Sequence, residues 1–149
     1  TDYIDKNSDI ASPHDLAGAY NGRGVAYGNK GQYDRAIADY TRAIEIKPDY
    51  HKAYNGLAWI YATCPSGSYI NGKKAVSYAR KAVSLNKNYG CIDTLAAALA
   101  RAGNFDEAVR EQKKSIALAK KAGVKSKYLN DFYKRLKLYK RGKPYTSKE

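Results

Sequence analysis

Residues 17–50 read AGAYNGRGVAYGNKGQYDRAIADYTRAIEIKPDY, and much of this pattern returns in residues 51–89, HKAYNGLAWIYATCPSGSYINGKKAVSYARKAVSLNKNY. Five positions keep their residue type: Tyr20 recurs as Tyr54, Asn21 as Asn55, Tyr27 as Tyr61, Ala36 as Ala75, and Ala43 as Ala82. The first three pairs are 34 residues apart and the last two are 39 apart, so the second unit holds five extra residues between its halves. A repeat of this length indicates stacked supersecondary units.

A third unit follows, because Gly31-Gln32-Tyr33 recurs as Gly103-Asn104-Phe105. Each unit has two stretches with apolar residues three, four and seven positions apart, and a Gly or Pro turn between them. Such spacing puts the apolar side chains on one face of a helix, so each unit is predicted to be a helix–turn–helix. One more helix is predicted over residues 126–141, whose apolar stripe consists of Leu129, Phe132, Leu136 and Tyr139.

The predicted helix ends carry suitable residues. Ser12-Pro13 is typical of an N-cap followed by the first helical position, and Asn71 and Asn104 are predicted to cap two later helices. Gly31, Gly103 and Gly123 are predicted stops, because glycine readily adopts the left-handed conformation. The sequence therefore predicts seven main helices, and the five extra residues are expected to form a turn at 65–71 that leaves both neighbouring helices intact.

The alternation of small and large residues at these positions resembles the tetratricopeptide repeat (TPR) family. In that family the first helix shows a large residue, then Leu-Gly, then Tyr, and the second shows Ala, an aromatic four later, and a Pro near the end. The first unit matches at Tyr20, Gly24, Tyr27, Ala36, Tyr40, Ala43 and Pro48, and departs at Arg23, where Leu is usual. The head of Arg23 is expected to reach a carboxylate, with Glu45, Asp5 or Asp9 as partner, because an unpaired buried charge is costly.

The resemblance implies an all-α fold: a right-handed solenoid of three repeats of bacterial type, closed by a C-terminal capping helix. The expected segments are residues 1–12 as a short helix or frayed segment, 13–50 as repeat 1, 51–88 as repeat 2 with its insertion near 65–71, 89–121 as repeat 3, and 122–149 as the basic capping helix and tail. It further implies that the first helix of each repeat lines a groove that binds a peptide or a partner helix.

Four residues are the candidates for such a groove. By the resemblance, Asn21 and Asn55 occupy equivalent groove-facing places, where a carboxamide can both donate to and accept from a peptide backbone. Trp59, one turn beyond Asn55, either anchors an apolar ligand side chain or packs beneath the insertion. Lys52 completes the set. The alternative for both asparagines is that they are surface residues without a binding role.

The net charge of +13 is concentrated near the C-terminus. Residues 113–149 hold 13 Lys or Arg against 2 Asp or Glu, whereas residues 1–112 hold 14 against 12. A block of this kind is usually a solvated face and less often binds anions. The alternative function is therefore nucleic-acid or anionic-membrane binding through Lys134, Arg135, Lys137 and Lys140. The apolar stripe of the same helix argues that closing the stack is its first role, so nucleic acid and membrane are unlikely partners.

Several classes of site lack support in the sequence. No catalytic triad pattern or phosphate-binding loop is found, so an enzyme, a cofactor and a small-molecule substrate are not expected. His14 and His51 are too few and too far apart for a metal cluster, and Cys64 and Cys91 are expected at opposite ends of neighbouring helices as free thiols. No run of 18 apolar residues occurs, which predicts a soluble protein, cytoplasmic or periplasmic.

Overall fold

The structure is a computed structural model that describes Ile4 and residues 11–148. Residues 11–148 contain seven α-helices, and the described residues contain no strand, which confirms the predicted all-α class. The helices are α2 (Pro13–Asn29), α3 (Tyr33–Ile46), α4 (His51–Thr63), α5 (Gly72–Leu85), α6 (Tyr89–Arg101), α7 (Phe105–Lys121) and α8 (Ser126–Lys140). The expectation for residues 1–12 lies mostly outside the described residues, although Ile4 is helical and buried.

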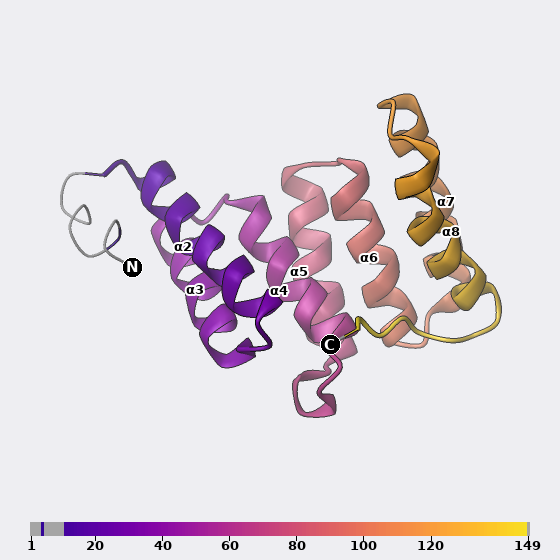
Figure 1. Cartoon of the computed structure of the whole chain (residues 1–149), viewed down its shortest axis with the longest axis horizontal. Coiled ribbons are helices and arrows are strands. Elements are labelled where there is room, and N and C mark those ends of the chain that lie inside the picture. The colour runs from indigo at the N-terminus through magenta and orange to yellow at the C-terminus, as the bar shows by residue number, and fades with distance from the viewer. Residues whose placement is uncertain (1–3, 5–10, 149) are drawn as a thin grey trace.

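The helices form an elongated stack of pairs (Figure 1). Helix α2 packs on α3, α4 on α5, and α6 on α7, and α8 packs on α7 at the end of the stack. The first helices of the pairs also touch, since α4 contacts both α2 and α6. Three side-by-side first helices therefore make up one face of the molecule.

Local sequence signals account for most helix boundaries. The hydroxyl of Ser12 accepts a hydrogen bond from the Asp15 amide at 3.1 Å, and Asn71 caps α5 by accepting from the Lys74 amide at 3.1 Å. The glycines predicted as stops have positive φ angles, for example +75° at Gly31. Asn104 is the N-cap residue of α7 as predicted, but its side chain makes no capping hydrogen bond, and its side-chain amide donates to Glu107 at 3.0 Å.

The ring of Tyr40, on α3, fits between the first two repeats. A Cβ atom built on Gly24 of α2 would lie 2.9 Å from this ring, and one built on Gly56 of α4 would lie 2.5 Å from it. Both distances are shorter than a real carbon contact, so the two glycines create the slot in which the buried ring lies. The glycine and alanine positions of the repeat pattern thus set the spacing of the helices.

The insertion forms a turn that leaves α4 and α5 intact, as predicted, and contains the short 3-10 helix η1 (Gly67–Tyr69). It is attached to α3, because the Tyr69 hydroxyl donates to Asp34 at 2.8 Å and the rings of Tyr33 and Tyr69 lie 5.4 Å apart. The prediction of free, buried thiols for Cys64 and Cys91 is also confirmed.

Arg23 reaches a carboxylate as expected, but its partner is Asp39 and not Glu45, whereas Asp5 and Asp9 lie outside the described residues. Its Nε and Nη2 atoms each donate to Asp39 at 2.8 Å. Asp39 lies on α3, the partner helix of α2 within the same pair, and its residue is only 5% exposed. The hydrogen bonds to Asp39 raise the pKa of Arg23 above the ordinary arginine value, and the ion pair joins the two helices.

Candidate binding groove

A groove with a volume of about 1020 Å³ runs along α2, α4 and the beginning of α6. All four groove candidates from the sequence, Asn21, Lys52, Asn55 and Trp59, line it. The structure therefore brings residues from two successive repeats to one surface. Tyr40 and Gly56, from the packing of the first two repeats, lie on the wall of the same groove.

Asn21 and Asn55 have an uncommon environment. Both residues are half-buried, yet their side-chain Oδ1 atoms are hidden from solvent and have no hydrogen-bond partner in the structure. A buried acceptor without a partner costs on the order of 1–3 kcal/mol, and a donor supplied by a ligand would recover part of that cost. The two oxygens are thus placed to accept N–H groups.

The charged side chains of this groove are all cationic. Lys30, Lys52 and Lys148 line it together with His51, and no Asp or Glu of the described chain is among the lining residues. Burial lowers the pKa of His51, and Lys52 lowers it further. The lysines therefore carry the positive charge of the groove at neutral pH.

Trp59 lies on the groove wall, and two side chains from the C-terminal part of the chain partly cover its ring. The ring of Tyr145 lies 5.9 Å from it, and the guanidinium carbon of Arg135 lies 5.7 Å from its centre. Trp59 lines the groove together with Pro65, Ser66 and Tyr69 of the insertion, so both alternatives for it stay open. Of the two covering side chains, Tyr145 comes from the segment after α8, which the sequence patterns did not reveal.

This segment, residues 143–148, is called the return segment below. It has no regular secondary structure and passes from the end of α8 back toward the end of α4, as the yellow trace in Figure 1 shows. Its last described residues, Ser147 and Lys148, line the groove. The signal available in the sequence was limited to Gly142 and Pro144, which indicate that the helix has ended but not where the chain goes.

Helix α6, the first helix of the third repeat, carries a different residue at the position equivalent to Asn21 and Asn55. Asp93 lies 38 residues after Asn55, and the same offset separates the starts of α4 and α6, so Asp93 holds the place of the two asparagines. Its oxygens accept from Arg135 Nε and Nη2, each at 3.1 Å, and from Gln112 Nε2 at 2.9 Å. Burial raises the pKa of Asp93, and Arg135 and Gln112 oppose this effect. Here the chain supplies its own donors.

The assignment of Arg135 to a basic surface is wrong. The residue is only 8% exposed, and its guanidinium lies against the rings of Phe132, Trp59 and Tyr145 as well as Asp93. The reason is its position on α8: it follows Phe132 by three residues and precedes Tyr139 by four, so it belongs to the buried stripe. Lys134, Lys137 and Lys140 are exposed as expected.

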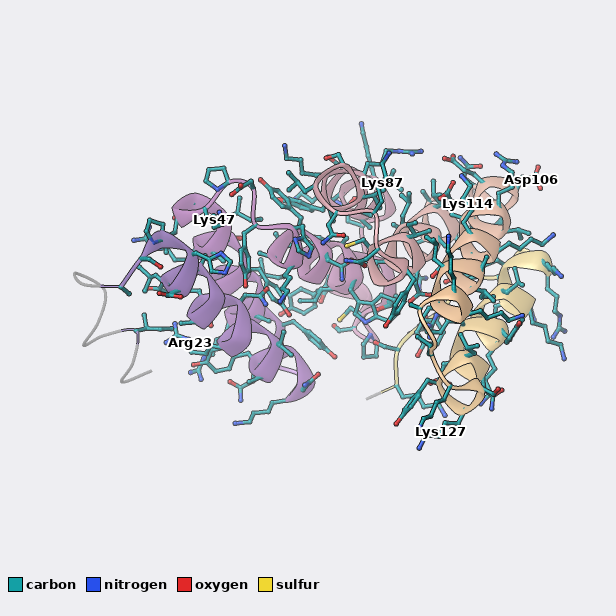
Figure 2. All side chains as sticks on the ribbon, turned by 90° about the horizontal axis from the view of Figure 1, so that it is seen from above. Arg23, Lys47, Lys87, Asp106, Lys114 and Lys127 are labelled. Carbon is teal, nitrogen blue, oxygen red and sulfur yellow. The ribbon has the colours of Figure 1, made fainter. Side chains whose placement is uncertain are left out.

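The remaining lysines of this region spread over the outer sides of α7 and α8. Lys114 and Lys127, labelled in Figure 2, project away from the stack. The apolar stripe lies on the opposite side of α8, with Leu129, Leu136 and Tyr139 buried. The described helix thus closes the stack with one face and carries its positive charge on the other.

Comparison with family models identifies the repeats. One tetratricopeptide repeat model matches residues 17–50, and another matches residues 90–122. The chain belongs to the tetratricopeptide repeat family. No curated protein matches it.

Membership in the tetratricopeptide repeat family confirms the predicted solenoid of helical hairpins. Tetratricopeptide repeats are generally protein–protein interaction modules, typically without catalytic activity. None of the described helices is both long and apolar enough to cross a bilayer. A search of the described residues for three or more His, Cys, Asp or Glu side chains that could hold a metal ion finds no such group.

Proposed function

We propose that the groove between α2 and α4 binds a segment of a partner protein, and that Asn21 and Asn55 bind its main chain. The observation that supports this most directly is the pair of hidden, unpartnered carboxamide oxygens at equivalent places on the two helices. Main-chain N–H groups are the donors that every residue other than proline offers, so two such acceptors recognise a chain by its backbone.

The groove has further properties suited to a peptide. Its volume of about 1020 Å³ lies at the upper end of the range for small-molecule pockets, roughly 300–1,000 Å³. Lys30 and Lys52 line the groove and give it positive charge, which supports a partner segment with acidic side chains. The function that we propose for the protein is therefore that of a non-catalytic binding module.

The test uses a double variant that carries both Asn21→Ala and Asn55→Ala. Asn130→Ala is the control. Asn130 is exposed on α8, away from the groove. Because the two oxygens have no partner in the free protein, their removal breaks no existing hydrogen bond, and the melting temperature should change little. Each hydrogen bond removed from the complex should cost about 0.5–1.5 kcal/mol, so the double variant should bind a partner roughly tenfold or more weakly.

The partner is first captured by cross-linking in cells, and its Kd is then measured by calorimetry at low and high salt. The proposal is wrong if the double variant binds the partner normally. Loss of binding in a variant with Lys134→Gln, Lys137→Gln and Lys140→Gln would then assign the binding to the basic face of α8. A steep fall of affinity with salt would accompany that result, because counter-ion release governs binding to nucleic acid. Arg135 is left unchanged in this arm, since its replacement would disturb the core.

A further inference from the structure

The return segment is bound to the stack through main-chain groups. The amide of Ser147 donates to the carbonyl of Thr63 at 2.8 Å, and its hydroxyl donates to the same oxygen at 3.0 Å. Arg101 Nη2 donates to the carbonyl of Tyr145 at 2.9 Å and to the Thr146 hydroxyl at 3.0 Å. One main-chain donor and one main-chain acceptor of the segment are therefore satisfied by the last residues of α4 and α6.

The receiving groups are held in position by the fold. Thr63 is the last residue of α4 and is 1% exposed, and its carbonyl is free to accept because helical bonding stops there. Arg101 is the last residue of α6, and its Nε donates to the Ala62 carbonyl at 2.6 Å. The guanidinium thus joins α6 to α4 and still presents Nη2 to the return segment.

One side chain of the segment enters an aromatic site. Tyr145 is partly buried, with its ring 5.9 Å from that of Trp59 and 5.4 Å from the guanidinium carbon of Arg135. Arg135 itself donates two hydrogen bonds to Asp93, which hold its guanidinium in place beside the ring. The Tyr145 ring is tilted by 43° against the indole ring and also faces the guanidinium, so aromatic packing and cation–π attraction stabilise it.

This aromatic site is continuous with the groove of Asn21 and Asn55, because Trp59 and Thr63, which contact the return segment, also line the groove. We propose that Trp59, Thr63 and Arg101 form a second peptide subsite, which takes a partner segment with an aromatic residue two positions before a Ser or Thr. In the free protein the chain's own Tyr145 and Ser147 fill it. The inference deepens the proposed function, because a partner that follows the groove past Asn55 displaces the return segment.

The experiment uses the complete chain and a probe of known sequence, so it needs no identified partner. A release variant, Tyr145→Ala with Ser147→Pro, removes the ring, the hydroxyl and the amide hydrogen that bind the segment. A fluorescent peptide with the sequence of residues 141–148 is titrated into the parent protein and into the release variant, and anisotropy is measured. The matched control peptide carries the same two replacements as the release variant.

The peptide should bind the release variant at least tenfold more tightly than the parent, and it should change the fluorescence of Trp59. The control peptide should bind neither protein measurably. Circular dichroism establishes that the variant keeps its helices, and Ser147→Pro alone serves as a milder variant if the double replacement unfolds the chain. With this single replacement the peptide should still bind more tightly than it does to the parent.

The subsite proposal is overturned if the peptide fails to bind the folded variants, or if it binds parent and variants equally. Because the peptide is the chain's own, this result does not depend on Asn21 and Asn55. Failure of the proposed function appears separately, as normal partner binding by the variant with Asn21→Ala and Asn55→Ala.

Discussion

The two ends of the stack differ at one equivalent position of the first helices. Along α2 and α4, Asn21 and Asn55 leave their oxygens without partners. Along α6, the equivalent Asp93 accepts hydrogen bonds from Gln112 and Arg135. Residues 91–100 of α6 are all buried, whereas α4 keeps several half-buried residues on its groove side.

The difference shows that the end of the array that is closed by a capping helix and the end that keeps unpartnered groove residues have different roles. A solenoid must be closed at its end, since the last repeat would otherwise expose an apolar face. Helix α8 closes it, and Arg135 on the same helix pairs with Asp93 on α6. Hidden polar atoms without a partner occur at both ends, Asn21 Oδ1 and Asn55 Oδ1 at the open end and Gln112 Oε1 and Tyr139 Oη at the closed end. Only the two asparagines line the groove, so only they are placed to meet a partner.

The largest effect is expected from opening the closed end. Replacing Leu129, Phe132 and Leu136 together by Ser should cost on the order of 6 kcal/mol or more, which is comparable with the stability of a domain. The protein should unfold or aggregate, as seen by circular dichroism and light scattering. The matched control replaces the exposed Lys134, Lys137 and Lys140 by Ser, with a cost of at most about 1.5 kcal/mol. A soluble triple variant that melts like the parent would show that α8 is an appendage.

An intermediate effect is expected from the ion pair alone. Arg135→Met keeps most of the side-chain stem but leaves the Asp93 carboxylate buried and without its cation, so stability should fall by about 3–5 kcal/mol. Urea denaturation measures the change. Adding Asp93→Asn to Arg135→Met should recover part of the loss, because the buried charge is then gone. Arg42→Ala is the exposed comparison, since its ion pair with Glu45 is open to solvent and should contribute little to stability. Equal losses in Arg135→Met and Arg42→Ala would contradict the contrast between buried and exposed pairs.

The smallest effect concerns the open end, where glycines set the helix spacing. Gly56→Ala places a methyl group against the buried Tyr40 ring and should destabilise by about 1–3 kcal/mol. Gly22→Ala, on α2, meets no atom within 4 Å and should be neutral or stabilising by about 0.4–1 kcal/mol. Thermal melts of the two variants should shift in opposite directions. Similar shifts would mean that helix propensity, and not the Tyr40 slot, controls this position.

The sequence predicts the local structure well because its signals are local. Ser12, Asn71 and the glycine stops act within one turn of the chain, and all of them were predicted correctly. The pairing of Arg23 with Asp39 was missed, because the choice among several carboxylates depends on how α2 and α3 pack. The repeat period predicts that two helices pair, but it does not give the rotation of each about its axis.

The candidate groove was predictable in part, because two of its residues belong to the sequence repeat. Asn21 and Asn55 repeat at a fixed spacing, so their common surface followed from the repeat pattern. Arg135 was placed on the surface because it belongs to a block of positive charge, although its spacing from Phe132 and Tyr139 already indicated the buried stripe. The position of the return segment could not be predicted, because residues 143–148 have no periodicity and depend on contacts with Thr63 and Arg101.

The Tyr40 ring also has a consequence for how the array opens. In a linear array, stability is the sum of each repeat's own folding free energy and a coupling free energy between neighbours. A ring that touches Gly24 on one repeat and Gly56 on the next belongs to the coupling part. The first pair of helices therefore cannot fray without exposing this ring and emptying the slot beside Asn55. Local opening should then involve both repeats as one cooperative unit, with similar hydrogen-exchange protection in α2 and α4.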